Sequence, residues 1–178
     1  MQATKKAPPA WPGEIYDVFK QVGIKQVAYV PDAGHTQLIK SCHADRSMNV
    51  ISLTTEEEGV AMLAGAWLGG QRGALLMQSS GVGNCINMMS ILQSCRITFL
   101  TLVTMRGEYA EFNPWQTPMS KATQGAMELM GIRVQRAERA DEVEDTVEAA
   151  LESAFGAGES MAVLLSQRLI GRKQWIKN

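Results

Sequence analysis

The chain has 178 residues, 46% of them hydrophobic and 20% charged, as expected for a globular domain of ordinary size with a full apolar core. Its formal net charge of -1 excludes the basic excess of a nucleic-acid-binding protein. No apolar run is long enough to span a bilayer, and the 3 cysteines lack metal-ligand spacing, so we expect reduced thiols in a cytoplasmic protein without a membrane segment.

Strand-like and helix-like segments alternate along the chain. This alternation predicts an α/β fold with a six-stranded parallel sheet and helices on both faces. Residues 1–12 are expected to form a flexible leader, residues 13–166 the α/β domain, and residues 167–178 a basic tail, either a loose end or a docking arm. We expect helices at 14–22, 34–43, 56–68, 86–92, 123–130 and 140–155, and strands at 26–30, 49–53, 73–78, 97–104, 132–135 and 161–165.

Three consecutive acids, Glu56, Glu57 and Glu58, open the third helix. With Thr55 as N-cap, Glu58 is the N3 residue of a capping box and folds back to the helix start. Glu57 is then the acid in phase with the apolar residues of the helix, and a carboxylate on a buried face needs a partner. We therefore expect Glu57 to be buried and functional, although a buried structural acid is an alternative. The apolar residues in phase are Val60, Ala61, Ala64, Trp67 and Leu68.

Polar residues follow several of the predicted strands, at the edge where open parallel sheets bind ligands. Gln78, Ser79 and Ser80 begin a glycine-rich stretch that ends at Asn84, which is either a binding loop or a simple tight turn. His35 follows the first strand, and Arg106 follows the fourth and begins a long polar loop. Arg106 is a candidate for binding an anionic group, and a surface salt bridge is an equal alternative.

Two stretches carry a family resemblance. The segment 54–67, TTEEEGVAMLAGAW, resembles the glutamate helix of thiamine-diphosphate-dependent decarboxylases. The segment 77–87, MQSSGVGNCIN, is similar to the corresponding stretch of phosphonopyruvate and sulfopyruvate decarboxylases, and Val30-Pro31-Asp32, Arg106-Gly107-Glu108 and the segment 114–119 fit the same enzymes. The likeness runs from about Glu14 to Leu165, and its two central motifs are more specific for the family than for the substrate.

The resemblance implies the pyrimidine-binding domain of a 2-oxo-acid decarboxylase. It places the family's glutamate at Glu57, which would hydrogen-bond N1′ of the aminopyrimidine and favour its 4′-imino tautomer. His35 is a second catalytic candidate, because Ala33 stands where several relatives have a catalytic Asp or Ser. The expected cofactor-binding residues are Glu57, Pro31, Gln78, Ser79, Ser80, Gly81 and Asn84, the expected substrate-binding residues are His35, Ser80 and Arg106, and no metal ligand is expected.

The family's diphosphate-binding motif, Gly-Asp-Gly followed by Asn, is missing from this chain. The resemblance therefore implies an alpha subunit whose separate beta subunit holds Mg²⁺ and the diphosphate of thiamine diphosphate. The resemblance further implies that the assembly decarboxylates sulfopyruvate, a small anionic 2-oxo acid, to sulfoacetaldehyde and carbon dioxide. We expect a hetero-oligomer, with a homodimer of this chain as an alternative assembly. The other functions left open are phosphonopyruvate or another 2-oxo acid as substrate, a non-catalytic regulatory or assembly subunit, and a flavodoxin-like domain that binds a nucleotide or flavin.

Overall fold

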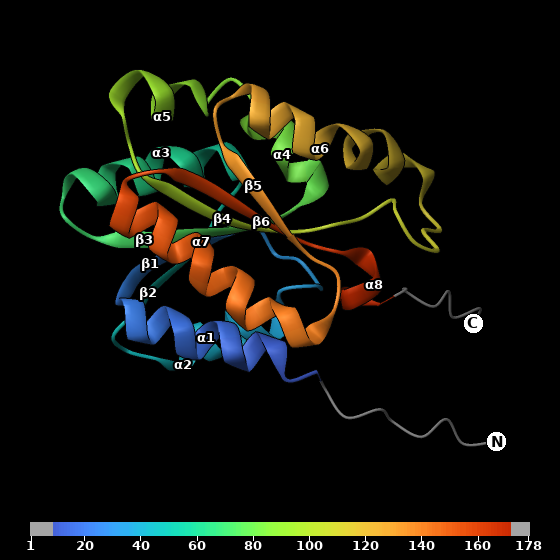
Figure 1. Ribbon diagram of the computed structural model, residues 1–178, viewed down its shortest axis with the longest axis horizontal. Helices are drawn as coiled ribbons and strands as arrows, with labels where there is room; N and C mark the ends of the chain where they lie inside the picture. The colour runs from blue at the N-terminus through green and yellow to red at the C-terminus, as the bar shows by residue number, and fades with distance from the viewer. Residues whose placement is uncertain (1–8, 172–178) are drawn as a thin grey trace.

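Six parallel strands form the central sheet of the computed structural model, which describes residues 9–171 (Figure 1). Their order is β2-β1-β3-β4-β6-β5, and every neighbouring pair is parallel. The predicted α/β fold with a six-stranded parallel sheet is confirmed. The strands are β1 (Ile24–Tyr29), β2 (Asn49–Ser52), β3 (Arg72–Gln78), β4 (Phe99–Thr104), β5 (Arg133–Ala137) and β6 (Ser160–Leu165).

Helices cover both faces of the sheet, and each face has its own apolar cluster. The first face carries α1 (Trp11–Val22), α2 (Thr36–Ala44) and α7 (Val143–Ala157), the last preceded by the short helix η2 (Ala140–Glu142) (Figure 1). The second carries α3 (Glu56–Leu68), α4 (Ser79–Cys85), α5 (Ser90–Cys95) and α6 (Thr117–Leu129), with η1 (Pro114–Gln116) before α6. The helices on each face pack apolar side chains against the sheet, so the central strands are buried on both faces.

The packed region extends past both predicted domain boundaries. Trp11 lies in the predicted leader but begins α1 and is 2% exposed. At the other end, α8 (Gln167–Ile170) lies in the predicted tail, and Gln167 is buried. The guanidinium of Arg168 lies 4.4 Å from the ring centroid of Tyr109, which attaches this segment to the long loop. Residues 1–8 and 172–178, the rest of the predicted leader and tail, lie outside the described residues.

The glycine-rich stretch after β3 is a helix, α4, and not the predicted turn. Glycine lowers helix propensity, which is why the sequence favours a turn here. Tertiary packing decides otherwise. A side chain at Gly81 would overlap the carboxylate of Glu56, and a Cβ at Gly83 would lie 3.0 Å from the sulfur of Met119. Both glycines therefore let neighbouring elements approach α4 closely.

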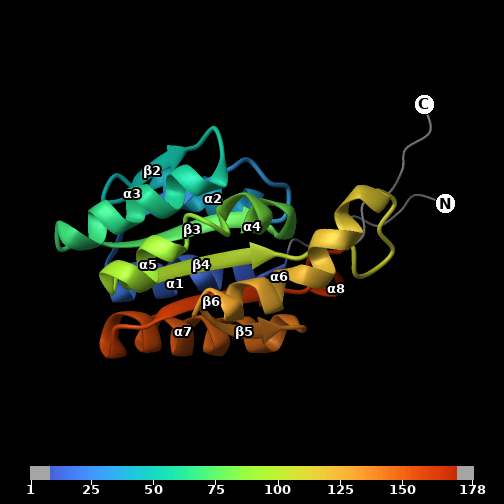
Figure 2. The same ribbon diagram turned by 90° about the horizontal axis from the view of Figure 1, so that it is seen from above.

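The carboxyl ends of the strands meet at one edge of the sheet, where α4 follows β3 and where α6 and α8 lie beyond the tip of β4 (Figure 2). Strand β2 lies on one side of β1, and β3 lies on the other side. The order of strands across the sheet therefore reverses at the boundary between β1 and β3. Such a reversal opens a crevice at the carboxyl edge, the usual ligand site of an open α/β sheet. Within residues 9–171, no helix is long and apolar enough to cross a membrane, and the cytoplasmic location stays a prediction.

Candidate functional site

Helix α3 turns Glu56, and not Glu57, towards the protein interior. Glu56 is 6% exposed, and the buried residues Gly59, Val60 and Leu63 follow it at helical spacing. Glu57 is exposed. The prediction that Glu57 heads the buried stripe is therefore wrong by one position.

The error comes from the last turn of α3. Leu68 was counted in the buried stripe but is 77% exposed, and Ala61 is exposed as well. Trp67 is only partly buried and packs against the ring of Phe155, 6.0 Å between centroids. We call Glu57, Ala61, Gly65 and Leu68 the outer stripe of α3, because these four residues share its exposed side.

The predicted backward contact of Glu58 is present, one residue earlier than expected. The backbone N–H of Thr54 donates to Oε2 of Glu58 at 2.9 Å. Thr55 is the N-cap residue, but its side chain makes no capping hydrogen bond. Glu58 therefore has the local structural role that the capping-box spacing predicts.

The buried acid Glu56 connects α3 to α4. Nδ2 of Asn84 donates to Oε2 of Glu56 at 2.8 Å, and the carboxylate packs against Gly81. The charge of the neighbouring Glu57 also affects a residue of α4, Cys85. The pKa of the Cys85 thiol rises to about 12, mainly through burial and further through the charges of Glu56 and Glu57. Both acids are thus close to α4, one beneath the surface and one on it.

The three polar residues after β3 have different environments. Oε1 of Gln78 is buried without a hydrogen-bond partner among the described residues, which leaves an acceptor available there. Ser79 is fully buried, and its Oγ accepts a hydrogen bond from the backbone N–H of Arg106 at 3.1 Å. Ser80 is partly exposed. Of the two serines predicted to bind cofactor, Ser79 holds the chain that follows β4, whereas Ser80 keeps exposed surface and its role stays a prediction.

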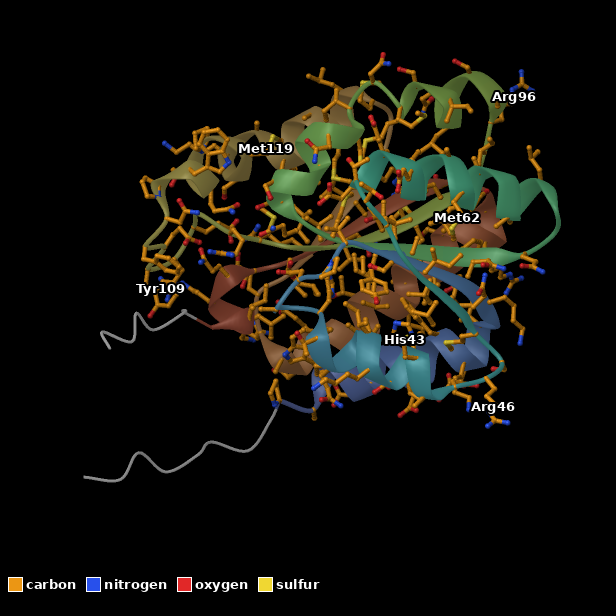
Figure 3. The ribbon with its side chains drawn as sticks, turned by 180° about the vertical axis from the view of Figure 1, so that it is seen from behind. His43, Arg46, Met62, Arg96, Tyr109 and Met119 are labelled. Atoms are coloured by element: carbon orange, nitrogen blue, oxygen red, sulfur yellow. The ribbon has the colours of Figure 1, made fainter. Side chains whose placement is uncertain are left out.

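An apolar groove of about 500 Å³ lies between α4 and the start of α6. Ser80 and Asn84 come from α4, and Pro118, Met119 and Ala122 from α6. Met119 is labelled in Figure 3, on α6 beside α4. The groove combines hydrogen-bonding groups on one wall with apolar surface on the other, as small-molecule sites do.

Trp115, in η1, also lines this groove and is 82% exposed. Sequence reasoning did not select it as a site residue. The available signal was its position in the segment 114–119, a part of the family resemblance.

Arg106, the predicted anion-binding residue, is paired within its own loop. Its Nε and one terminal nitrogen donate to the two carboxylate oxygens of Glu111, both at 2.8 Å. The side chains are 10% and 5% exposed. This bidentate pair lowers the pKa of Glu111 to about 2, with further help from N–H groups of Asn113, Gln167 and Gly107. Of the two alternatives for Arg106, the geometry favours an ion pair, buried rather than on the surface.

His35 is fully buried, so its side chain has no exposed surface at the edge where it was expected to act. Nε2 lies 3.1 Å from the carbonyl oxygen of Leu102 and 3.3 Å from that of Met77, and Nδ1 has no partner in the described structure. Burial lowers the imidazole pKa, so the neutral ring with hydrogen on Nε2 fits this place. The residue connects β3 and β4, and its predicted contact with substrate has no support from this geometry.

Asp32 is a polar residue that the sequence analysis did not select. Its Oδ2 accepts hydrogen bonds from Oγ1 of Thr104 at 2.6 Å and from the backbone N–H of Gly34 at 3.1 Å. Together with Arg106 and Gln167, these residues line a cavity of about 140 Å³ at the carboxyl edge. Pro31 is exposed beside it. Within residues 9–171, no group of three or more His, Cys, Asp and Glu side chains is placed to hold a metal ion.

Comparison with known proteins gave consistent matches. The sulfopyruvate decarboxylase alpha subunit of Methanococcus maripaludis is 32% identical over 85% of this chain and 91% of the relative. That of Methanothermobacter thermautotrophicus is 30% identical over 85% of this chain and 92% of the relative. The phosphonopyruvate decarboxylase of Streptomyces hygroscopicus is 38% identical over 51% of this chain but 23% of the relative.

The solved structures confirm the fold. A 2-oxoglutarate:ferredoxin oxidoreductase from Magnetococcus marinus superposes with a TM-score of 0.73 over 89% of this chain and 29% of that one, at 14% identity. A scan against protein-family models found no match.

Proposed function

The chain belongs to the family of sulfopyruvate decarboxylase alpha subunits, and we propose that it is the pyrimidine-binding half of a thiamine-diphosphate-dependent decarboxylase that converts sulfopyruvate to sulfoacetaldehyde and carbon dioxide. The observation that carries this proposal is the exposed carboxylate of Glu57, on the same helix end as a buried acid bonded to the groove residue Asn84. An acid that must act on a bound cofactor has to be reachable in the separate chain. Exposure therefore supports the role of Glu57 better than the burial first expected.

The residues around the groove fit the aminopyrimidine of thiamine diphosphate. Gln78 offers a buried oxygen without a partner, and Ser80 and Asn84 offer side-chain hydrogen bonds on the groove wall. When bound, thiamine diphosphate supplies an electron sink for the bond that releases carbon dioxide. In this proposal Glu57 holds a proton in a hydrogen bond to the pyrimidine nitrogen N1′, and the apolar wall of the groove excludes water from it.

A separate beta subunit is proposed to cover this surface and to hold Mg²⁺ and the diphosphate. Trp115, 82% exposed, and Leu68, 77% exposed, lie on the elements that carry the groove and the outer stripe of α3. Large apolar side chains in such positions are typical anchors of a protein interface. They support a hetero-oligomer in which the partner buries Glu57 together with the cofactor.

The substrate is proposed to be sulfopyruvate, with phosphonopyruvate as the second candidate because of the Streptomyces relative. In either case Arg106 reaches the anion only if the substrate displaces Glu111 from its guanidinium. We therefore assign the first substrate contact to Ser80, which lines the groove without such a competitor.

The test is to co-express the chain with a candidate beta subunit and to measure carbon dioxide release from both 2-oxo acids, with and without thiamine diphosphate and Mg²⁺. Glu57→Gln is expected to lower kcat by about 100-fold or more, the usual range for loss of a general acid-base group. Glu58→Gln is the matched control, because it changes a neighbouring exposed acid and leaves an oxygen for the N–H of Thr54. Full activity of Glu57→Gln, or turnover by the single chain alone, contradicts the proposal.

A further inference from the structure

The orientation of the Asn84 side chain is set by Glu56. The amide nitrogen of Asn84 donates to the Glu56 carboxylate at 2.8 Å, and within residues 9–171 the side chain makes no other hydrogen bond. A carboxylate has only acceptor oxygens, so it attracts the NH₂ group of an asparagine and repels its carbonyl oxygen. Glu56 thus selects one of the two amide orientations, with Oδ1 turned away from it.

Glu56 is suited to this task because it cannot easily move. It is 6% exposed on the first turn of α3, and its carboxylate packs against Gly81 without room for a Cβ there. A buried carboxylate held next to an exposed amide is an anchor for that amide, whereas an exposed acid would exchange its partner with water.

Asn84 lines the groove with Ser80, and within residues 9–171 its Oδ1 accepts no hydrogen bond, so this oxygen is the acceptor that Asn84 offers to a ligand. We propose that Glu56 is a positioning residue, which holds Asn84 so that Oδ1 accepts a hydrogen bond from the exocyclic amine of the aminopyrimidine. The inference rests on the proposed function. It divides the work of two adjacent acids: Glu57 contacts the cofactor from outside, and Glu56 orients a second contact from inside.

A pair of ligands that differ at the amine tests this assignment. Thiamine diphosphate carries the exocyclic amine, a donor, and its 4′-oxo analogue carries an oxygen in the same place. By calorimetry on the assembly of this chain with its beta subunit, Glu56→Ala is expected to weaken thiamine diphosphate binding about tenfold, the effect of losing one oriented hydrogen bond. Affinity for the 4′-oxo analogue should change by less than about threefold, because this ligand has no amine to donate to Oδ1 of Asn84.

A second set of substitutions exchanges the acid and the amide between positions 56 and 84. It distinguishes loss of the oriented hydrogen bond from misfolding of the variant. Asn84→Asp places two carboxylates together and should weaken thiamine diphosphate binding at least as much as Glu56→Ala. In the double variant Glu56→Gln with Asn84→Asp, the new amide donates to the new carboxylate, which keeps an acceptor oxygen facing the groove. The double variant should therefore restore thiamine diphosphate affinity to within about threefold of the unmodified chain.

The outcomes are distinguishable. Equal weakening of both ligands shows a structural role only and overturns the inference, as does unchanged affinity for thiamine diphosphate in Glu56→Ala. Weaker association of the two chains with unchanged cofactor affinity assigns Asn84 to the partner surface and also overturns it. If the unmodified assembly binds no thiamine diphosphate, the proposed function itself fails, and this inference with it.

Discussion

Glu111 is expected to hold the long loop after β4 in place, and its replacement by Gln is the most direct test of that role. The carboxylate receives both hydrogen bonds from Arg106 and one each from the backbone of Gly107 and Asn113. Nε2 of Gln167 on α8 also donates to it, at 2.8 Å. Glu111→Gln keeps the shape of the side chain and removes its charge, so it tests the ion pair rather than the packing.

The magnitude follows from the pKa of Glu111, which falls from 4.5 to about 2 in the folded protein. At about 1.4 kcal/mol per pKa unit, this difference corresponds to at most about 3.5 kcal/mol of stability at pH 7. The amide oxygen introduced by Glu111→Gln still accepts part of these hydrogen bonds, so we expect the smaller loss of about 2 kcal/mol.

The pH dependence has a defined sign. The folded-state pKa of Glu111 is below its unfolded value, so its contribution is fully present above pH 4.5 and is lost as the pH falls towards 2. The stability difference between the unmodified chain and Glu111→Gln should therefore shrink to less than about half of its neutral value by pH 3.

Urea unfolding followed by tryptophan fluorescence, at pH 7 and at pH 3, measures both quantities. Glu148→Gln is the control, an exposed acid in the middle of α7, and should change stability by less than about 0.5 kcal/mol. Equal stability of Glu111→Gln and the unmodified chain at pH 7 would refute the reasoning. So would a difference that stays constant between the two pH values.

Three further outcomes are expected. Gly81→Ala should destabilise the fold by about 1–3 kcal/mol, because the new Cβ meets the carboxylate of Glu56. Gly125→Ala in α6 has open space around the new Cβ and should stabilise the fold by up to about 1 kcal/mol. Urea unfolding measures both, and equal effects of the two substitutions would contradict the packing argument. A maleimide at pH 7 should label one thiol per native chain, Cys95, because burial raises the pKa of the other two to about 12, and mass spectrometry would reveal a second label if this is wrong. Trp115→Ala should leave stability within about 0.5 kcal/mol but weaken association with the beta subunit about tenfold in a pull-down titration, and unchanged association would remove Trp115 from the proposed interface.

The sheet was predictable because its signals are local. The predicted strand 73–78 is an apolar run between turn residues, and residues 73–77 are buried in β3. The helix after Ala140 carries a regular apolar stripe in which Val147 and Leu151 are fully buried. Helix α4 was not predictable by these rules. Its glycines argue against a helix locally, and the contacts that favour one come from Glu56 and Met119, which are distant in the sequence.

The site was only partly predictable for a related reason. Sequence periodicity finds the side of a helix that faces the sheet, but the last turn of α3 extends past that contact, so Leu68 shifted the predicted phase by one residue. The pairing of Arg106 with Glu111 has no periodic signature, because it depends on how an irregular loop folds back. The burial of His35 likewise depends on carbonyl groups of β3 and β4 that come together only in the sheet.

Glu56 and Glu57, the adjacent acids of α3, show why burial alone does not identify the functional acid when an active site is shared between two chains. Successive helical residues are about 100° apart, so Glu56 and Glu57 cannot share one environment. In a complete active site, a buried carboxylate would be the natural candidate for an activated acid. Under the proposed function this chain supplies half of a site. Its buried acid, Glu56, is already bonded to Asn84, so the exposed acid, Glu57, is the one available to the cofactor. In this proposal Glu57 is therefore selected by its exposure near α4, the helix that forms one wall of the groove, rather than by burial.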